Sequence, residues 1–120
     1  MKKSIILVVL IFWVFSSIPP SKVVYTSAQN ATIDDIIAYN SSKYDVPARE
    51  LIHIINCESG GKRSAHHLSP KEDSWGVVQI NLKAHPNITK QQATDPNFSV
   101  DYLAKNVAIG KGKMWSCYRS

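Results

Sequence analysis

The sequence has few acidic residues, few cysteines and no long apolar run, and each shortage excludes a class of protein. Its 120 residues contain 9 Asp and Glu against 14 Lys and Arg, which gives a net charge of +5. The longest apolar run, residues 5–15, would span roughly 17 Å as a helix, well short of the ~30 Å hydrocarbon core of a membrane. A conventional transmembrane helix is therefore not expected.

The excess of basic residues is concentrated at the N-terminus. Lys2, Lys3 and Lys22 lie within the first 28 residues, where no acidic residue occurs, and the rest of the chain has 11 basic and 9 acidic side chains. A nucleic-acid-binding surface needs basic residues clustered on one face, and the sequence shows no such stripe. We therefore expect no nucleic-acid partner.

Residues 1–28 have the layout of a secretory signal peptide. A short basic start precedes the apolar run, and a segment rich in Ser and Pro ends it. Cleavage after Ser16 or after Ala28 would leave a small residue at the junction, so the cleavage point stays open between them. An uncleaved short anchor is the alternative, and it would be the only contact with a membrane. We expect an exported protein, secreted, periplasmic or at the cell surface, with one domain over residues 29–120.

That domain contains two cysteines, Cys57 and Cys117. In an oxidising compartment such a pair usually forms a disulfide. It would close a loop of about 60 residues, which corresponds to about 3 to 4 kcal/mol of stabilisation in the chain-entropy description. Zinc is the alternative, with His53, His66 and His67 as further ligands. Because the paired ligand spacing of structural zinc sites is missing, we expect a disulfide and no metal.

Capping and periodicity patterns predict a mainly helical domain with a small β element. Thr32 stands three residues before Asp35, as in a capping box, and predicts a helix that fades near residues 40–42. Pro47 predicts the start of a second helix, whose apolar stripe ends near Ser59 before two glycines.

The C-terminal half gives weaker signals. Residues 62–73 are polar and predict a mobile loop, and residues 74–81 predict a strand or a sharp hairpin. Residues 89–92 form another capping box, and Asp95 before Pro96 predicts a long final helix that ends near Ala108.

Glu58 has an unusual position in the second predicted helix. It follows Ile54 by four residues and Leu51 by seven, so it lies on the apolar stripe, in the last turn. Acidic residues normally lie on a solvated face, and the negative end of the helix dipole disfavours a charge there. Both effects favour the neutral acid. An ordinary ion pair with Lys62 or Arg63 is the structural alternative.

Three short motifs occur in one order over residues 33–117. Residues 57–61 read Cys-Glu-Ser-Gly-Gly, residues 74–81 read Ser-Trp-Gly-Val-Val-Gln-Ile-Asn, and residues 95–100 read Asp-Pro-Asn-Phe-Ser-Val. Together they resemble the Glu-Ser-Gly, Gly-x-x-Gln-Ile and Asp-Pro-x-x-Asn-Ile motifs of the lysozyme superfamily, in particular its soluble lytic transglycosylase domain. The third motif departs at Ser99, where the family usually has Asn, and at Asn106, where a Tyr is common.

The resemblance implies an α+β, mainly α, lysozyme-like fold in which a small β-hairpin faces a helix-end glutamate. It implies a lytic transglycosylase that cuts the MurNAc-GlcNAc β-1,4 bond of peptidoglycan glycan strands, with Glu58 as catalytic acid and base. Ser74, Trp75, Gln79 and Asn81 would line the substrate cleft. We expect a monomer, and the chemistry needs no organic cofactor and no metal.

Two other functions stay open. A hydrolytic lysozyme would need a second carboxylate or a positioned water, and Asp73 is the candidate acid beside the second motif. Animal-type lysozymes have their Asp at the position of Ser74, so a strand would point Asp73 to the other face, which favours the single-acid mechanism. The other alternative is a non-catalytic glycan-binding module, which would have little reason to keep Glu58 on an apolar stripe. Backbone bonding for Gln79 and core packing for Trp75 are the structural alternatives for those two residues.

Overall fold

Two consecutive helices open the described part of the chain, which is residues 30–119 of a computed structural model. α1 (Ile33–Tyr44) begins at a capping box between Thr32 and Asp35, which confirms the predicted start. The helix runs two residues beyond the predicted end at residues 40–42, and the buried side chain of Asn40 donates to Ile36 O at 2.9 Å and is accommodated within the helix. The predicted signal peptide, residues 1–28, lies outside the described residues.

α2 (Ala48–Ser59) follows Pro47 and ends at Gly60, as the sequence predicts. Gly60 has a φ of 63°, in the left-handed region that glycine adopts without steric cost. The apolar stripe of α2 is buried through Leu51, Ile54 and Ile55. The last turn of this helix therefore carries Glu58 at the edge of the core.

The polar segment at residues 62–73 is not a loop, so that prediction is wrong. It contains β1 (His66–Ser69) and the first half of β2 (Glu72–Trp75), and β3 (Ile80–Asn81) completes an antiparallel sheet of order β1-β2-β3. Three of the four β1 residues are exposed, so this hairpin lacks the alternation of apolar and polar residues that marks a half-buried strand.

The turn between β2 and β3, residues 76–79, contacts the short helix α3 (Lys90–Thr94). Gly76 has a φ of 84°, and a Cβ at this position would lie 1.9 Å from Ala93 O. Only glycine therefore permits both the turn and this close backbone approach. The capping box of Thr89 and Gln92 at the start of α3 is confirmed.

The last long helix, α4 (Pro96–Ala108), starts as predicted, with Asp95 accepting a hydrogen bond from Asn97 N at 2.9 Å. A short 3-10 turn, η1 (Gly112–Met114), leads into the C-terminal tail. None of the helices within residues 30–119 is both long and apolar enough to cross a membrane.

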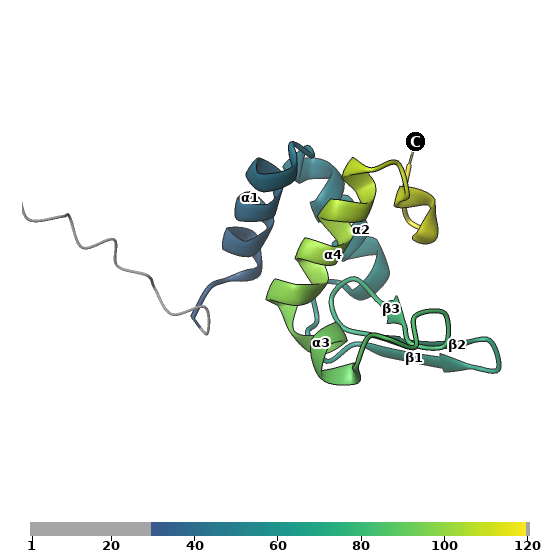
Figure 1. Ribbon diagram of the computed structural model, residues 1–120. Coiled ribbons are helices and arrows are strands. Elements are labelled where there is room, and N and C mark those ends of the chain that lie inside the picture. Colours follow the sequence, from purple (N-terminus) through teal and green to yellow (C-terminus); the bar gives the residue numbers. More distant parts are fainter. Residues whose placement is uncertain (1–29, 120) are drawn as a thin grey trace, which may run out of the picture.

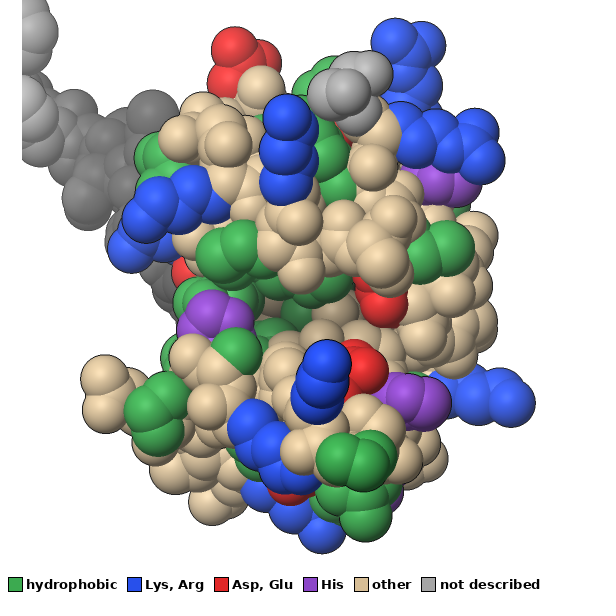
Figure 2. Space-filling view, turned by 90° about the vertical axis from the view of Figure 1, so that its right-hand side faces the viewer, with side chains coloured by type: hydrophobic (Ala, Val, Ile, Leu, Met, Phe, Trp, Pro, Cys, Tyr) green, Lys and Arg blue, Asp and Glu red, His purple; other side chains and the backbone are tan. Residues whose placement is uncertain are grey.

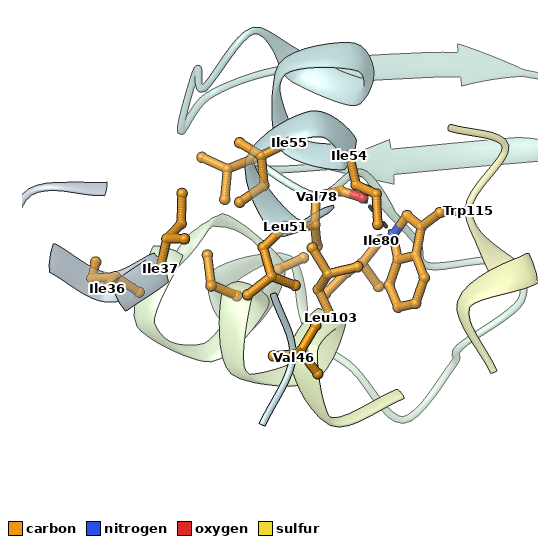
Figure 3. Packing of buried hydrophobic residues seen from close by; sticks show 14 residues of the cluster. Ile36, Ile37, Val46, Leu51, Ile54, Ile55, Val78, Ile80, Leu103 and Trp115 are labelled. Atoms are coloured by element: carbon orange, nitrogen blue, oxygen red, sulfur yellow. Dashed lines mark hydrogen bonds between the residues drawn. The ribbon is translucent and has the colours of Figure 1, made fainter. Parts of the chain in front are cut away.

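The core lies among α1, α2, α4 and the turn at residues 76–79, while the sheet extends to one side of these helices (Figure 1). Val77 and Val78 of the turn are completely buried against the helices. Trp115 packs over the same turn, and its Nε1 donates to Val78 O at 2.8 Å (Figure 3). The result is an α+β domain whose C-terminal segment is fixed to the turn between β2 and β3.

A disulfide joins Cys57 and Cys117, as predicted, with a Cα–Cα distance of 6.0 Å. It attaches the tail to the last turn of α2, at the residue before Glu58. The zinc alternative is excluded because it required these two thiols as ligands.

Candidate active site

A cavity of about 260 Å³ lies between the last turn of α2, the sheet and α4. Residues 114–116 complete its wall. Figure 2 views the side of the molecule on which the C-terminal segment and the sheet face each other, and a hollow crosses this face with acidic side chains above and below it. The acidic residues that line the cavity are Glu58 and Glu72.

Glu58 is held by the C-terminal tail. Its Oε1 accepts hydrogen bonds from Ser116 Oγ and from Cys117 N, both at 3.2 Å. A backbone N–H can only donate, so Oε1 serves as an acceptor in the ionised and in the neutral acid. The other oxygen, Oε2, makes no hydrogen bond with any residue within 30–119, so it is the carboxyl oxygen left free for a ligand.

The structural alternative for Glu58 is not observed. Among residues 30–119, it forms no ion pair with Lys62 or Arg63. Arg63 donates instead to Ala31 O at 3.1 Å, at the start of the described chain. The carboxyl group of Glu58 is thus available to the cavity.

Ser59, the serine of the first motif, connects α2 to the turn between β2 and β3. Its Oγ donates to Val77 O, and it also accepts from Gly61 N at 3.1 Å. This residue therefore has a structural role, since it fixes the end of α2 against the turn that forms the neighbouring wall.

Gln79 and Asn81 line the cavity, but their polar atoms bind the backbone. Gln79 Nε2 donates to Ala65 O and Gly76 O, each at 3.0 Å, which agrees with the backbone alternative. Asn81 Oδ1 accepts from the backbone N–H groups of Asp73 and Lys83, each at 3.1 Å. Both side chains stabilise the β2–β3 hairpin, which forms one wall of the cavity.

Ser74 and Trp75, two further predicted cleft residues, are not among the residues that line the cavity. Ser74 is completely buried, and its Oγ donates to Glu72 Oε1 at 2.6 Å. Trp75 stacks on His66 with ring centroids 3.6 Å apart, and Lys90 Nζ lies 4.0 Å from the centroid of the same indole. Trp75 thus lies in a cluster with other side chains outside the cavity.

Asp73 does not reach the cavity either, and Glu72 is the acid that sequence reasoning missed. Successive side chains on a strand point to opposite faces, so Glu72 and Ser74 share one face of β2 and Asp73 lies on the other. There Asp73 Oδ1 lies 2.7 Å from His66 Nε2 and accepts from Trp75 Nε1 at 2.8 Å. The hydrogen bond with His66 lowers the pKa of Asp73. Counting two residues back from Ser74, rather than one, would have identified Glu72.

Tyr102 and His85 also line the cavity and were not predicted. The Tyr102 hydroxyl lies 3.2 Å from His85 Nδ1, and the Tyr102 ring meets Trp115 edge-on with centroids 6.0 Å apart. Burial raises the pKa of Tyr102, so this hydroxyl is neutral at physiological pH. Aromatic rings of this kind present an apolar face and a polar edge to a ligand.

Ser99 and Asn106, the two residues at which the third motif departs from the family, do not line the cavity. Ser99 is completely buried in α4. Asn106 Nδ2 donates to Tyr102 O at 2.8 Å, one turn earlier on the same helix. Residues four apart share a helix face, so Tyr102 supplies a tyrosine on the face where Asn106 lacks one.

Comparisons with known proteins provide no assignment. No protein-family model matches the chain, and no curated protein and no solved structure matches it. The chemistry of the site must be argued from its residues. Two carboxyl groups and a neutral tyrosine surround one polar cavity, and within residues 30–119 no group of three or more His, Cys, Asp or Glu is arranged to hold a metal ion. Such a site suits proton transfer to and from a bound ligand.

Proposed function

We propose that this chain is an exported lytic transglycosylase with a lysozyme-like fold, which cleaves the MurNAc-GlcNAc β-1,4 bond of peptidoglycan in the cavity at Glu58. The observation that carries the proposal is the position of Glu58: it lines the cavity, two hydrogen bonds from the tail hold its Oε1, and its Oε2 makes no hydrogen bond within residues 30–119. The order of a helix-end glutamate, a small sheet and a later helix around one cavity supports the fold that the three motifs imply.

In the proposed reaction, Glu58 first acts as an acid. It transfers its proton to the glycosidic oxygen, and the bond between this oxygen and C1 of MurNAc breaks. The 6-hydroxyl of the same MurNAc then forms a new bond to C1, and its proton returns to the Glu58 carboxylate. The products are a 1,6-anhydro end and a free GlcNAc hydroxyl, so Glu58 is regenerated without a metal or an organic cofactor.

A hydrolytic muramidase is the second candidate, and Glu72 favours it. This carboxylate lines the same cavity as Glu58, and the hydrogen bond from Ser74 fixes one of its oxygens. Hydrolysis uses such a second carboxylate as a nucleophile or to activate water. The second carboxylate in this mechanism is Glu72 and not Asp73, which pairs with His66 outside the cavity.

The variant Glu58→Gln tests the proposal. The amide oxygen of the substituted side chain can accept the same two hydrogen bonds, so we expect an unchanged thermal midpoint. Loss of the acid should lower the rate of wall lysis, measured as the fall in turbidity of a peptidoglycan suspension, by at least about 10² to 10⁴. Asp34→Asn, which removes an exposed charge on α1 outside the cavity, is the control and should lyse normally. Full lysis by Glu58→Gln would refute the proposal.

Mass spectrometry of the digested wall separates the two enzymes, because anhydro and reducing ends differ by one water. For a transglycosylase we expect anhydro ends, and Glu72→Gln should keep these ends and most of the rate. For a hydrolase we expect reducing ends and a loss of activity in Glu72→Gln as large as in Glu58→Gln. Asp73→Asn should leave the product ends unchanged in both cases. A glycan-binding module would sediment with the wall and release no fragments.

A further inference from the structure

A second cavity, of about 590 Å³, lies between the start of α2 and the C-terminal tail. Pro47, Arg49, Glu50 and His53 line it from one side, and Tyr118 and Arg119 line it from the other. We call it the basic cavity, because two arginines and a histidine face one acid. None of these residues lines the cavity at Glu58.

The guanidinium groups of the basic cavity have no hydrogen-bonding or ion-pair partner in the part of the chain that the structure describes. Among residues 30–119, neither Arg49 nor Arg119 makes a side-chain hydrogen bond or an ion pair. His53 Nε2 is enclosed and also has no hydrogen-bond partner there, which costs free energy. Guanidinium groups bind planar oxyanions through paired N–H donors, so an oxyanion is the ligand that these side chains fit.

The net charge of the residues that line the basic cavity indicates the charge of the oxyanion that would bind there. Glu50 is the only acid among them, so the two arginines leave the lining with a net charge of +1, apart from His53. A singly charged group neutralises this net charge. Carboxylates and phosphodiesters both carry one charge at neutral pH.

The tail that forms one wall is held in place. The disulfide at Cys117 precedes Tyr118, and Tyr118 N donates to Trp115 O at 3.1 Å. The Tyr118 ring packs on Gly112 so closely that a Cβ on Gly112 would lie 2.5 Å from it. The basic cavity is therefore part of the folded domain.

The two cavities share a helix and a tail. His53 precedes Glu58 by five residues on α2, which is about 7.5 Å along the helix axis. On the tail, Ser116 lines the cavity at Glu58 and Tyr118 lines the basic cavity. Lys and Arg side chains with a histidine gather above the acidic end of the hollow in Figure 2. Five residues also turn the side chains of His53 and Glu58 about 140° apart around the helix. A polymer bound at Glu58 can therefore place a charged substituent in the basic cavity only by passing around the tail, along Ser116 and Tyr118.

We infer that the basic cavity binds a singly charged oxyanion, a carboxylate or a phosphodiester, carried by the polymer that is cut at Glu58. The identity of that polymer rests on the proposed function. The binding of the anion does not, because it depends only on Arg49, His53 and Arg119.

Titration with acetate and with dimethyl phosphate, followed by amide NMR shifts at low salt, tests the site directly. We expect shifts at residues 49, 53, 118 and 119, and affinity for at least one anion that falls roughly tenfold or more in Arg49→Gln/Arg119→Gln. Lys71→Gln/Lys111→Gln removes the same charge from exposed side chains elsewhere and should bind as the wild type. Absence of binding, or equal weakening in both double variants, would overturn the inference.

Sedimentation with insoluble cell wall then identifies the source of the anion. Each double variant is combined with Glu58→Gln, so that the wall is not degraded during the assay. The fraction of protein that sediments is then compared between intact walls and walls stripped of phosphate polymers. Weaker binding of the arginine variant to both walls assigns the site to a carboxylate, and weaker binding to intact walls alone assigns it to a phosphodiester. Equal binding of both variants to both walls refutes the link to the polymer. If Glu58→Gln lysed walls normally, the proposed function would fail while the acetate and phosphate titrations stood.

Discussion

Removal of the Cys57–Cys117 disulfide should destabilise the domain and also lower the activity of its folded form. The bond closes a separation of 60 residues. In the chain-entropy description a 15-residue loop contributes about 3 kcal/mol and a 100-residue loop about 4.7, so about 4 kcal/mol is expected here. In a domain of this size, each kcal/mol changes the thermal midpoint by about 4–8 °C. We expect Cys57→Ala/Cys117→Ala to unfold about 16–32 °C lower than the wild type.

The effect on activity follows from the hydrogen bonds of the tail. Ser116 and Cys117 supply both donors to Glu58 Oε1, and the disulfide fixes their position. We therefore expect lysis per folded molecule to fall at a temperature well below the lowered midpoint. Reduction of the wild-type protein by dithiothreitol should reproduce both changes, and the double variant should not respond to the reductant.

The assays are circular dichroism for the midpoint and the turbidity of a wall suspension for lysis, on the same samples. A lowered midpoint with unchanged lysis per folded molecule would show that the tail does not position the acid. An unchanged midpoint would refute the stability argument itself.

Three further substitutions test individual contacts. Gly76→Ala should lower the free energy of unfolding by about 3 kcal/mol or more in urea, because its Cβ would overlap Ala93 O at a positive φ; a loss below about 1 kcal/mol would contradict this. Burial opposes ionisation of Asp101, but hydrogen bonds from Lys43 and Tyr44 lower its pKa. The ionised Asp101 therefore stabilises the fold above the unfolded pKa near 4, and this stabilisation is lost as the pH falls through the lower pKa of the folded state. Asp101→Asn should accordingly lower the thermal midpoint at pH 7, and this loss should shrink as the pH falls below about 4. Ser116→Ala should slow wall lysis by about tenfold without a change in the midpoint, and Ser116→Thr should restore it; equal losses in both variants would refute a role for the hydroxyl.

Local signals predicted the helices because each signal acts within a few residues. The hydroxyl of Thr32, the ring of Pro47 and the conformational freedom of Gly60 determine helix ends without help from the rest of the chain. The end of α1 was predicted two residues early because the burial of Asn40, which keeps it in the helix, depends on tertiary packing.

The candidate site was predicted only in part, for a similar reason. Glu58 was identified because its neighbours on one helix define an apolar stripe. Glu72 was missed because residues 62–73 were predicted to be a loop, so the alternation of side chains on the strand was not followed back from Ser74. His85 and Tyr102 reach the cavity from segments that meet only in the folded chain, and no local pattern marks them.

The turn at residues 76–79 is bonded to both of the segments that surround Glu58. Ser59 on α2 donates to Val77 O, and Trp115 on the tail donates to Val78 O at 2.8 Å. Neither segment can swing away from the turn unless a hydrogen bond at the edge of the core breaks. The conformational entropy of the two segments is therefore lost during folding, and ligand binding does not need to order them. A rigid ligand that already matches the cleft should gain most from this preorganisation, while a flexible glycan must supply the conformational adjustment itself.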